Sequence, residues 1–205
     1  MHVYRKLDSV IWNNKIIVVI LQKNKNMESR STKYVYSQEV IDMLTVAVQI
    51  CLVLEHLENA EKTGFIDKML KLLPMLFLKT EMLEADEHEI EGYLQTFVSE
   101  EEYNIVAADV ANLMGNDDAY LDVFIEGMRY SDTPVTSFIS ENLADIYQEL
   151  KDLAGNFQSG NENVMEDALH EVIESFHSNW GQKLLNTLRA LFIIKNNFNN
   201  NLLPD

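Results

Sequence analysis

Apolar residues recur at intervals of three and four positions through most of this chain, and that spacing constrains its fold more than any other feature. Residues spaced in this way lie on one face of an α-helix, which can be buried against other helices. The pattern is clear between Ser37 and Leu57, where the recurring apolar positions are Val40, Leu44, Val48 and Cys51. We therefore predict that this segment is an amphipathic helix.

Turn residues are too few for most β folds. Seven Gly and three Pro are spread over 205 residues, whereas a sandwich or barrel needs turn residues at intervals of about eight to twelve positions. The hydrophobic content of 47% is too high for a disordered chain. The fold class that we predict is all-α, in the form of a single-domain bundle of about six helices.

Start and stop signals divide the rest of the chain into further helices. Ser99 and Glu102 have the spacing of a capping box, in which hydroxyl and carboxylate each accept a hydrogen bond from a backbone N–H. Pro74 should kink a strongly apolar helix or end its first half. The additional helices that we predict run from Phe65 to Leu78, from Ser99 to Gly115, from Ser140 to Phe157 and from Glu162 to Asn196.

Two local features interrupt this helical pattern. Gly181 lies within the last and longest helix, where it either bends the helix or lets a neighbouring backbone approach closely. Residues 116–134 form a long predicted loop, in which the apolar group from Tyr120 to Ile125 packs as one helical turn. The sequence leaves open whether the helices form one bundle or two sub-bundles joined at this loop.

Both ends of the chain differ in composition from its middle. Residues 1–26 are rich in Asn and carry five basic residues against one acidic residue, Asp8. We expect them to be a short, flexible or non-native leader, with Met27 as the natural start; a β-strand added to a partner is the alternative. The all-helical domain then spans residues 27–196, and residues 197–205 form a flexible tail.

Between Lys79 and Arg129 the chain has no Lys or Arg, yet it carries fourteen Asp and Glu residues. The whole chain has a formal net charge of −17. A charge distribution of this kind repels nucleic acid and anionic membranes, and it attracts cationic partners. The residues that we expect to bind such a partner are Glu84, Asp86, Glu87, Glu89, Asp117, Asp118 and Asp122.

Several classes of function lack their sequence signals. The chain has neither a glycine-rich phosphate loop nor a Gly-x-Ser-x-Gly elbow. Its basic residues are scattered, whereas a nucleic-acid-binding face gathers them. The apolar run from Ile16 to Leu21 is too short to cross a bilayer, and the single cysteine, Cys51, falls among core positions. We expect no cofactor, no nucleic acid and no membrane, and a protein as the partner.

One flank of the last predicted helix carries the best candidate for a metal site. Asp167, His170, Glu174 and His177 follow one another there at intervals of three, four and three residues. The spacing of Glu174 and His177 is the one by which a helix offers ligands to iron or manganese in ferritin-like bundles. Such bundles need this motif on two helices, and the chain has no second copy. A metal site would therefore use His170, Glu174 and His177 with Asp145 and Glu149; the alternative is a solvated or hydrogen-bonded flank.

The C-terminal half contains three distinctive segments, Leu143 to Asp152, Phe176 to Leu184 and Leu188 to Leu191, with Trp180-Gly181 ahead of the last. Together with Tyr120 to Phe124 and Lys71 to Leu76, they resemble a bacterial family known as domain of unknown function 5063. The resemblance covers most of residues 37–195 and implies an all-helical cytoplasmic domain with no assigned activity. Many members have His near the Trp–Gly pair, where this chain has Asn179 and Lys183.

Charge and the family resemblance together favour a non-enzymatic interaction or regulatory module that binds a cationic partner through its acidic surface. A metal-dependent helical-bundle enzyme is the second hypothesis. An inhibitor that mimics DNA is the third. The sequence identifies neither the partner nor the oligomeric state.

Overall fold

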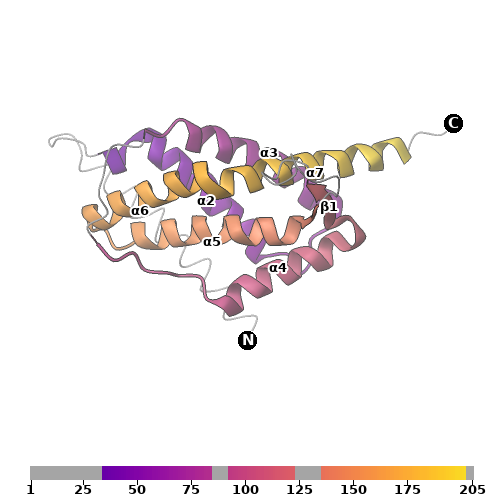
Figure 1. Ribbon diagram of the computed structural model, residues 1–205, viewed down its shortest axis with the longest axis horizontal. Helices are drawn as coiled ribbons and strands as arrows, with labels where there is room; N and C mark the ends of the chain where they lie inside the picture. Colours follow the sequence, from indigo (N-terminus) through magenta and orange to yellow (C-terminus); the bar gives the residue numbers. More distant parts are fainter. Residues whose placement is uncertain (1–33, 85–91, 123–134, 202–205) are drawn as a thin grey trace.

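The computed structural model describes residues 34–84, 92–122 and 135–201 (Figure 1). Within these ranges helices form the body of the protein, and the prediction of an all-α bundle is confirmed. The α-helices are α2 (Gln38–Glu55), α3 (Lys62–Glu81), α4 (Glu100–Met114), α5 (Ile139–Phe157), α6 (Glu162–Ser175) and α7 (Gly181–Asn201). The shorter elements are η1 (Tyr34–Tyr36), η2 (Gly115–Asp117), β1 (Ala119–Asp122), β2 (Val135–Phe138) and the π-helical turn η4 (Phe176–Trp180).

Local signals set the helix ends where the sequence predicts them. The Ser37 hydroxyl oxygen accepts a hydrogen bond from the backbone N–H of Val40 at the start of α2. The capping box of Ser99 and Glu102 is present at the start of α4, with both reciprocal bonds formed. Gly115 ends α4 at a positive φ of 57°, which glycine adopts without strain. The predictions of a capping box at Ser99 and Glu102 and of a helix stop at Gly115 are confirmed.

Helix α5 is the centre of the bundle. It packs against α2, α4, α6 and α7, and Figure 1 shows it between α4 on one side and α6 and α7 on the other. One large cluster of buried side chains draws on every α-helix from α2 to α7. The described helices therefore share one core, and Cys51 lies within it, as predicted.

The last predicted helix is one long helical segment with a change of winding in its middle. Helix α6 continues through the π turn into α7, which extends to Asn201 rather than ending at Asn196. Pro74 lies inside α3 on its exposed side and does not end that helix. Among the described residues, the bundle contains no helix with the length and apolar character that a membrane span requires.

The predicted helical turn within residues 120–125 is wrong where the structure describes it. Ala119–Asp122 is a β-strand that pairs in antiparallel register with Val135–Phe138. The backbone carbonyl of Asp118 accepts a bond from the N–H of Ile139, which fixes the start of α5 beside the start of β1. This anchoring places the residues that follow Asp118 beside the residues that precede Ile139, where the two segments pair as antiparallel strands. Residues 123–125 of the predicted turn lie outside the described ranges.

Candidate functional site

Many of the basic side chains that the structure describes are held in internal ion pairs. The pairs are Lys62–Asp117, Lys79–Asp42, Lys151–Glu55, Lys183–Asp145 and Lys195–Asp67. Each pair neutralises a lysine within the fold, whereas the described ranges hold far more Asp and Glu than Lys and Arg. The excess of negative charge is therefore carried by the surface.

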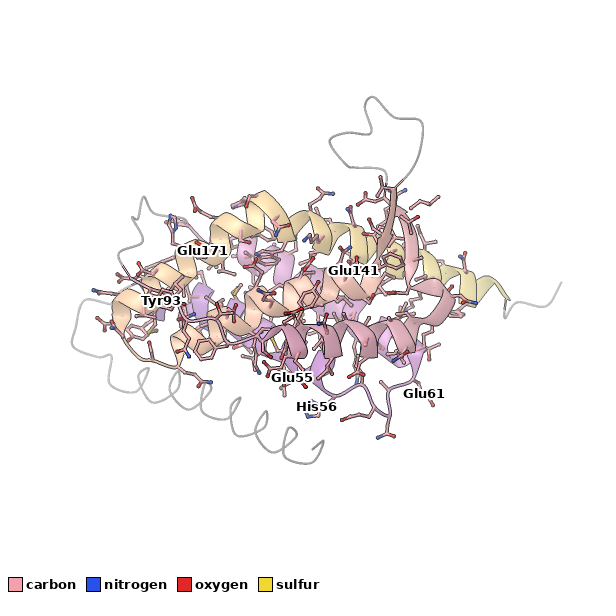
Figure 2. The ribbon with its side chains drawn as sticks, turned by 60° about the horizontal axis from the view of Figure 1, so that its bottom comes forward. Glu55, His56, Glu61, Tyr93, Glu141 and Glu171 are labelled. Carbon is pink, nitrogen blue, oxygen red and sulfur yellow. The ribbon has the colours of Figure 1, made fainter. Side chains whose placement is uncertain are left out.

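The packed helices α4, α5 and α6 carry many of these carboxylates. We call this set the acidic face, and its residues are Glu100, Glu101, Glu141, Asp145, Glu149, Asp152, Glu171 and Glu174. The four on α5 follow a single helical stripe. Figure 2 shows Glu141 and Glu171 toward opposite ends of this surface. The charge of Glu171 acts on Glu149 across the boundary between α6 and α5.

The α5 carboxylates in the middle of the acidic face are oriented by neighbouring helices. Asp145 accepts a hydrogen bond from the Tyr103 hydroxyl at 2.8 Å and an ion-paired bond from Lys183 Nζ at 2.7 Å. Glu149 accepts a bond from the Ser175 hydroxyl at 2.7 Å. Burial raises the pKa of Glu149, although the bond from Ser175 opposes that rise. These two carboxylates are therefore held in place before any partner arrives.

The C-terminal end of the α5 stripe holds an extended segment, residues 92–98, which we call the strap. Asp152 Oδ1 accepts bonds from the backbone N–H groups of Phe97 and Val98, at 2.6 and 3.1 Å. Asn156 bonds both backbone groups of Gln95, donating to its carbonyl at 2.9 Å and accepting from its N–H at 3.0 Å. The strap thus satisfies four of its backbone groups on side chains of α5 as it leads into α4.

The seven residues predicted to bind a partner do not form one surface among the described residues. Asp118 and Asp122 are each only 8% exposed. Asp118 accepts bonds from the Ser140 N–H and hydroxyl, and Asp122 accepts one from the Asn186 side chain. Both carboxylates therefore have structural roles at the start of α5 and beside α7. They are not available as a docking surface.

The other predicted partner-binding residues differ in their surroundings. Asp117 pairs with Lys62, and Glu84 is exposed just after α3. Asp86, Glu87 and Glu89 lie outside the described residues. Of the seven, Glu84 is thus the one whose described surroundings leave it on the open surface.

The five candidate metal ligands do not converge. Glu149 of α5 accepts a hydrogen bond from the Ser175 hydroxyl of α6. His170 Nδ1 lies 3.9 Å from Glu174 Oε2, but the Glu174 side chain is 66% exposed and His177 is exposed as well. Asp145 is bonded to Tyr103 and Lys183. Within the described ranges, no three His, Cys, Asp or Glu side chains form a group that could hold a metal ion.

Sequence reasoning missed a buried polar network between α2 and α5. Glu55 Oε1 accepts bonds from the Tyr147 hydroxyl at 2.9 Å and from Lys151 Nζ at 2.6 Å. The Glu55 side chain is only 8% exposed and that of Lys151 13%. Burial and the Glu55 charge raise the pKa of Tyr147. Tyr147 and Lys151 are one turn apart on one helix, but no local signal indicates a carboxylate that lies about ninety residues earlier in the chain.

Comparisons with known proteins match a family model and a solved structure. A family model described as domain of unknown function (DUF5063) matches residues 34–197. The crystal structure of protein BF1032 from Bacteroides fragilis is 37% identical and has a TM-score of 0.71; the match covers 80% of this chain and 96% of that one. No curated protein matches the chain.

Proposed function

The chain belongs to the DUF5063 family, whose description assigns no activity, and we propose that it is a non-enzymatic interaction module that binds a cationic protein surface. The binding surface is the acidic face on α4, α5 and α6. This proposal replaces the predicted partner residues Asp118 and Asp122, which are buried, with carboxylates on those three helices.

The proposal rests on a difference between the two kinds of charge: five lysines are held in ion pairs, whereas many carboxylates are exposed. Internal ion pairs occupy Lys62, Lys79, Lys151, Lys183 and Lys195. The acidic face keeps its exposed members Glu100, Glu101, Glu141, Glu171 and Glu174 at the surface. Although Lys183 pairs with Asp145, the exposed carboxylates of this face repel one another, and a cationic partner relieves that repulsion.

The geometry of the face suits a folded partner with clustered Lys or Arg. Asp145 and Glu149 are fixed by Tyr103 and Ser175, so they need little ordering when a partner binds. Carboxylates held in defined positions also favour the planar, two-pronged guanidinium of Arg. Nucleic acid and anionic membranes would instead be repelled by this surface.

A paired set of variants tests the proposal. The face variant carries Glu101→Gln and Glu141→Gln; the control variant carries Glu39→Gln and Glu81→Gln, which are exposed residues of α2 and α3. Each variant loses two negative charges; the face variant loses two Glu from the first turns of helices and the control variant loses one. The face variant and the control variant therefore have the same net charge.

We expect the wild-type protein to capture a basic protein from a bacterial lysate at low ionic strength. At about 1 M salt the screening length falls to about 3 Å, so the complex should dissociate. The control variant should retain the same protein and the face variant should lose most of it. Equal capture by both variants, or a complex that survives high salt, would show that the acidic face is not the binding surface.

A further inference from the structure

A small cleft lies where α2 passes into α3, away from the acidic face. Its volume is about 320 Å³, at the lower end of the range of about 300 to 1,000 Å³ seen for small-molecule sites. The residues that line it are Leu52, Val53, His56, Leu57, Asn59, Ala60, Glu61, Gly64, Phe65 and Lys68. Figure 2 shows His56 and Glu61 projecting from this connection on one side of the molecule.

The floor of the cleft is apolar and firmly held. Phe65 is 2% exposed and Leu57 is 8% exposed, and both belong to the main core. Gly64 leaves the wall open, since a Cβ built at that position would have no atom within 4 Å. The cleft is therefore open beside Gly64, where an apolar group can approach Leu57 and Phe65.

The rim of the cleft supplies directed polar groups. His56 Nδ1 lies 2.9 Å from the backbone carbonyl of Leu52. A carbonyl can only accept, so Nδ1 carries the proton, and this bond fixes the plane of the ring at the edge of the cleft. Asn59 adds an amide at the same edge.

The positive charge of Lys68 favours a ligand with a negatively charged group. Lys68 is exposed, and no carboxylate among the described residues forms a salt bridge with it, unlike Lys62 and Lys79 of the same helix. The first backbone N–H groups of α3 lie at this end, and the Glu61 side chain makes no capping hydrogen bond to them. The cleft thus joins an apolar floor to a local cation in an otherwise acidic protein.

We infer that this cleft binds a small apolar monocarboxylate, with its hydrocarbon part against Leu57 and Phe65 and its carboxylate beside Lys68. Glu61 at the rim would repel a second negative charge, so a monoanion fits better than a dianion. This site is independent of the proposed partner-binding function, because the cleft lies on α2 and α3.

Three probes of one shape and different charge test the inference: phenylacetate, phenylacetamide and phenethylamine. The readout is the NMR shift of the backbone amides of Gly64, Phe65 and Lys68 in the full chain. We expect phenylacetate to shift them with a dissociation constant on the order of millimolar. The neutral amide should bind more weakly and the amine should cause no saturable shift.

Matched variants locate the site. Lys68→Gln should weaken phenylacetate binding about three- to fivefold, as expected for one partly exposed ion pair. Lys71→Gln removes the same charge from an exposed position one turn further along α3, outside the cleft lining, and should leave the affinity within about twofold. Gly64→Leu fills the opening and should abolish binding while the helix remains intact.

The inference is overturned if phenethylamine or the amide binds as tightly as phenylacetate. It is also overturned if the Gly64→Leu variant, shown by its NMR spectrum to be folded, still binds phenylacetate. Absence of any shift in the three amides at about 10 mM phenylacetate would overturn it as well.

Discussion

The indole Nε1 of Trp180 donates a hydrogen bond to the backbone carbonyl oxygen of Val172, with a separation of 3.1 Å in a fully buried site. The bond spans the π turn, in which the N–H of Gly181 bonds the carbonyl of Phe176. The Phe176 ring packs against Trp180, with 4.6 Å between the ring centroids. The Trp–Gly pair that carries the family resemblance therefore builds the change of winding between α6 and α7.

Replacement of Gly181 by Ala should destabilise the protein by about 1 to 3 kcal/mol. A Cβ at this position would lie 2.5 Å from the carbonyl oxygen of Phe176, which is backbone and cannot move aside as a side chain can. The free energy of unfolding, measured by urea denaturation, tests this. Gly64→Ala is the control, because its Cβ meets open space in α3, and it should stabilise by about 0.5 to 1 kcal/mol. Equal effects of the two changes would contradict this role for Gly181.

Local sequence signals account for much of the fold. The capping box at Ser99 and the helix stop at Gly115 depend on residues within a few positions of each other. The same reasoning failed for β1. Its strand conformation depends on pairing with β2, which follows later in the chain and is not a local sequence neighbour. A short apolar run has no periodicity of its own that separates a helical turn from a strand.

The surroundings of the predicted partner-binding residues could not be read from the sequence, for a related reason. The carboxylates of the acidic block between Lys79 and Arg129 are adjacent in sequence, but the fold buries Asp118 and Asp122 and uses them to fix neighbouring segments. The acidic face instead combines stripes from α4, α5 and α6. Helical periodicity gives each stripe, but only the packing of the helices shows which stripes share a surface.

Replacement of Lys151 by Met should destabilise the protein by about 3 to 5 kcal/mol. The change leaves the buried Glu55 carboxylate with Tyr147 as its hydrogen-bond donor and removes its cationic partner. The double variant Glu55→Gln with Lys151→Met should recover most of this loss, because no buried charge then remains unpaired. Urea denaturation of the four proteins in this cycle measures the coupling. A double variant as unstable as Lys151→Met would show that packing of Lys151, rather than its charge, is what matters.

Replacement of Asn156 by Leu should release the strap. The substitution removes both bonds to the backbone of Gln95, and the cost should be about 1 to 3 kcal/mol. Hydrogen exchange of the amides of residues 92–98 should accelerate more than that of the α5 interior. Asp152→Asn is the matched control, since its side-chain oxygen can still accept from Phe97 and Val98. Uniform acceleration over the whole chain would mean that Asn156 supports the core instead.

Replacement of Glu149 by Gln should stabilise the protein at pH 7 and have little effect near pH 4. Burial raises the pKa of Glu149 in the folded state, so the folded protein holds this proton more tightly than the unfolded chain does. The stability that the protonated carboxyl contributes is fully present below the unfolded pKa of about 4.3, and it is lost as the pH rises through the folded pKa. Gln resembles the protonated form at every pH and can still accept the bond from Ser175.

Urea denaturation of the wild type and Glu149→Gln at pH 4 and pH 7 measures this difference. Removing one negative charge from a chain of net charge −17 also reduces general repulsion at pH 7. Glu174→Gln on the neighbouring helix, at a side chain that is 66% exposed, controls for that effect. The gain of Glu149→Gln at pH 7 should exceed that of the control. Equal gains would mean that net charge, rather than the burial of Glu149 between α5 and α6, sets the pH dependence.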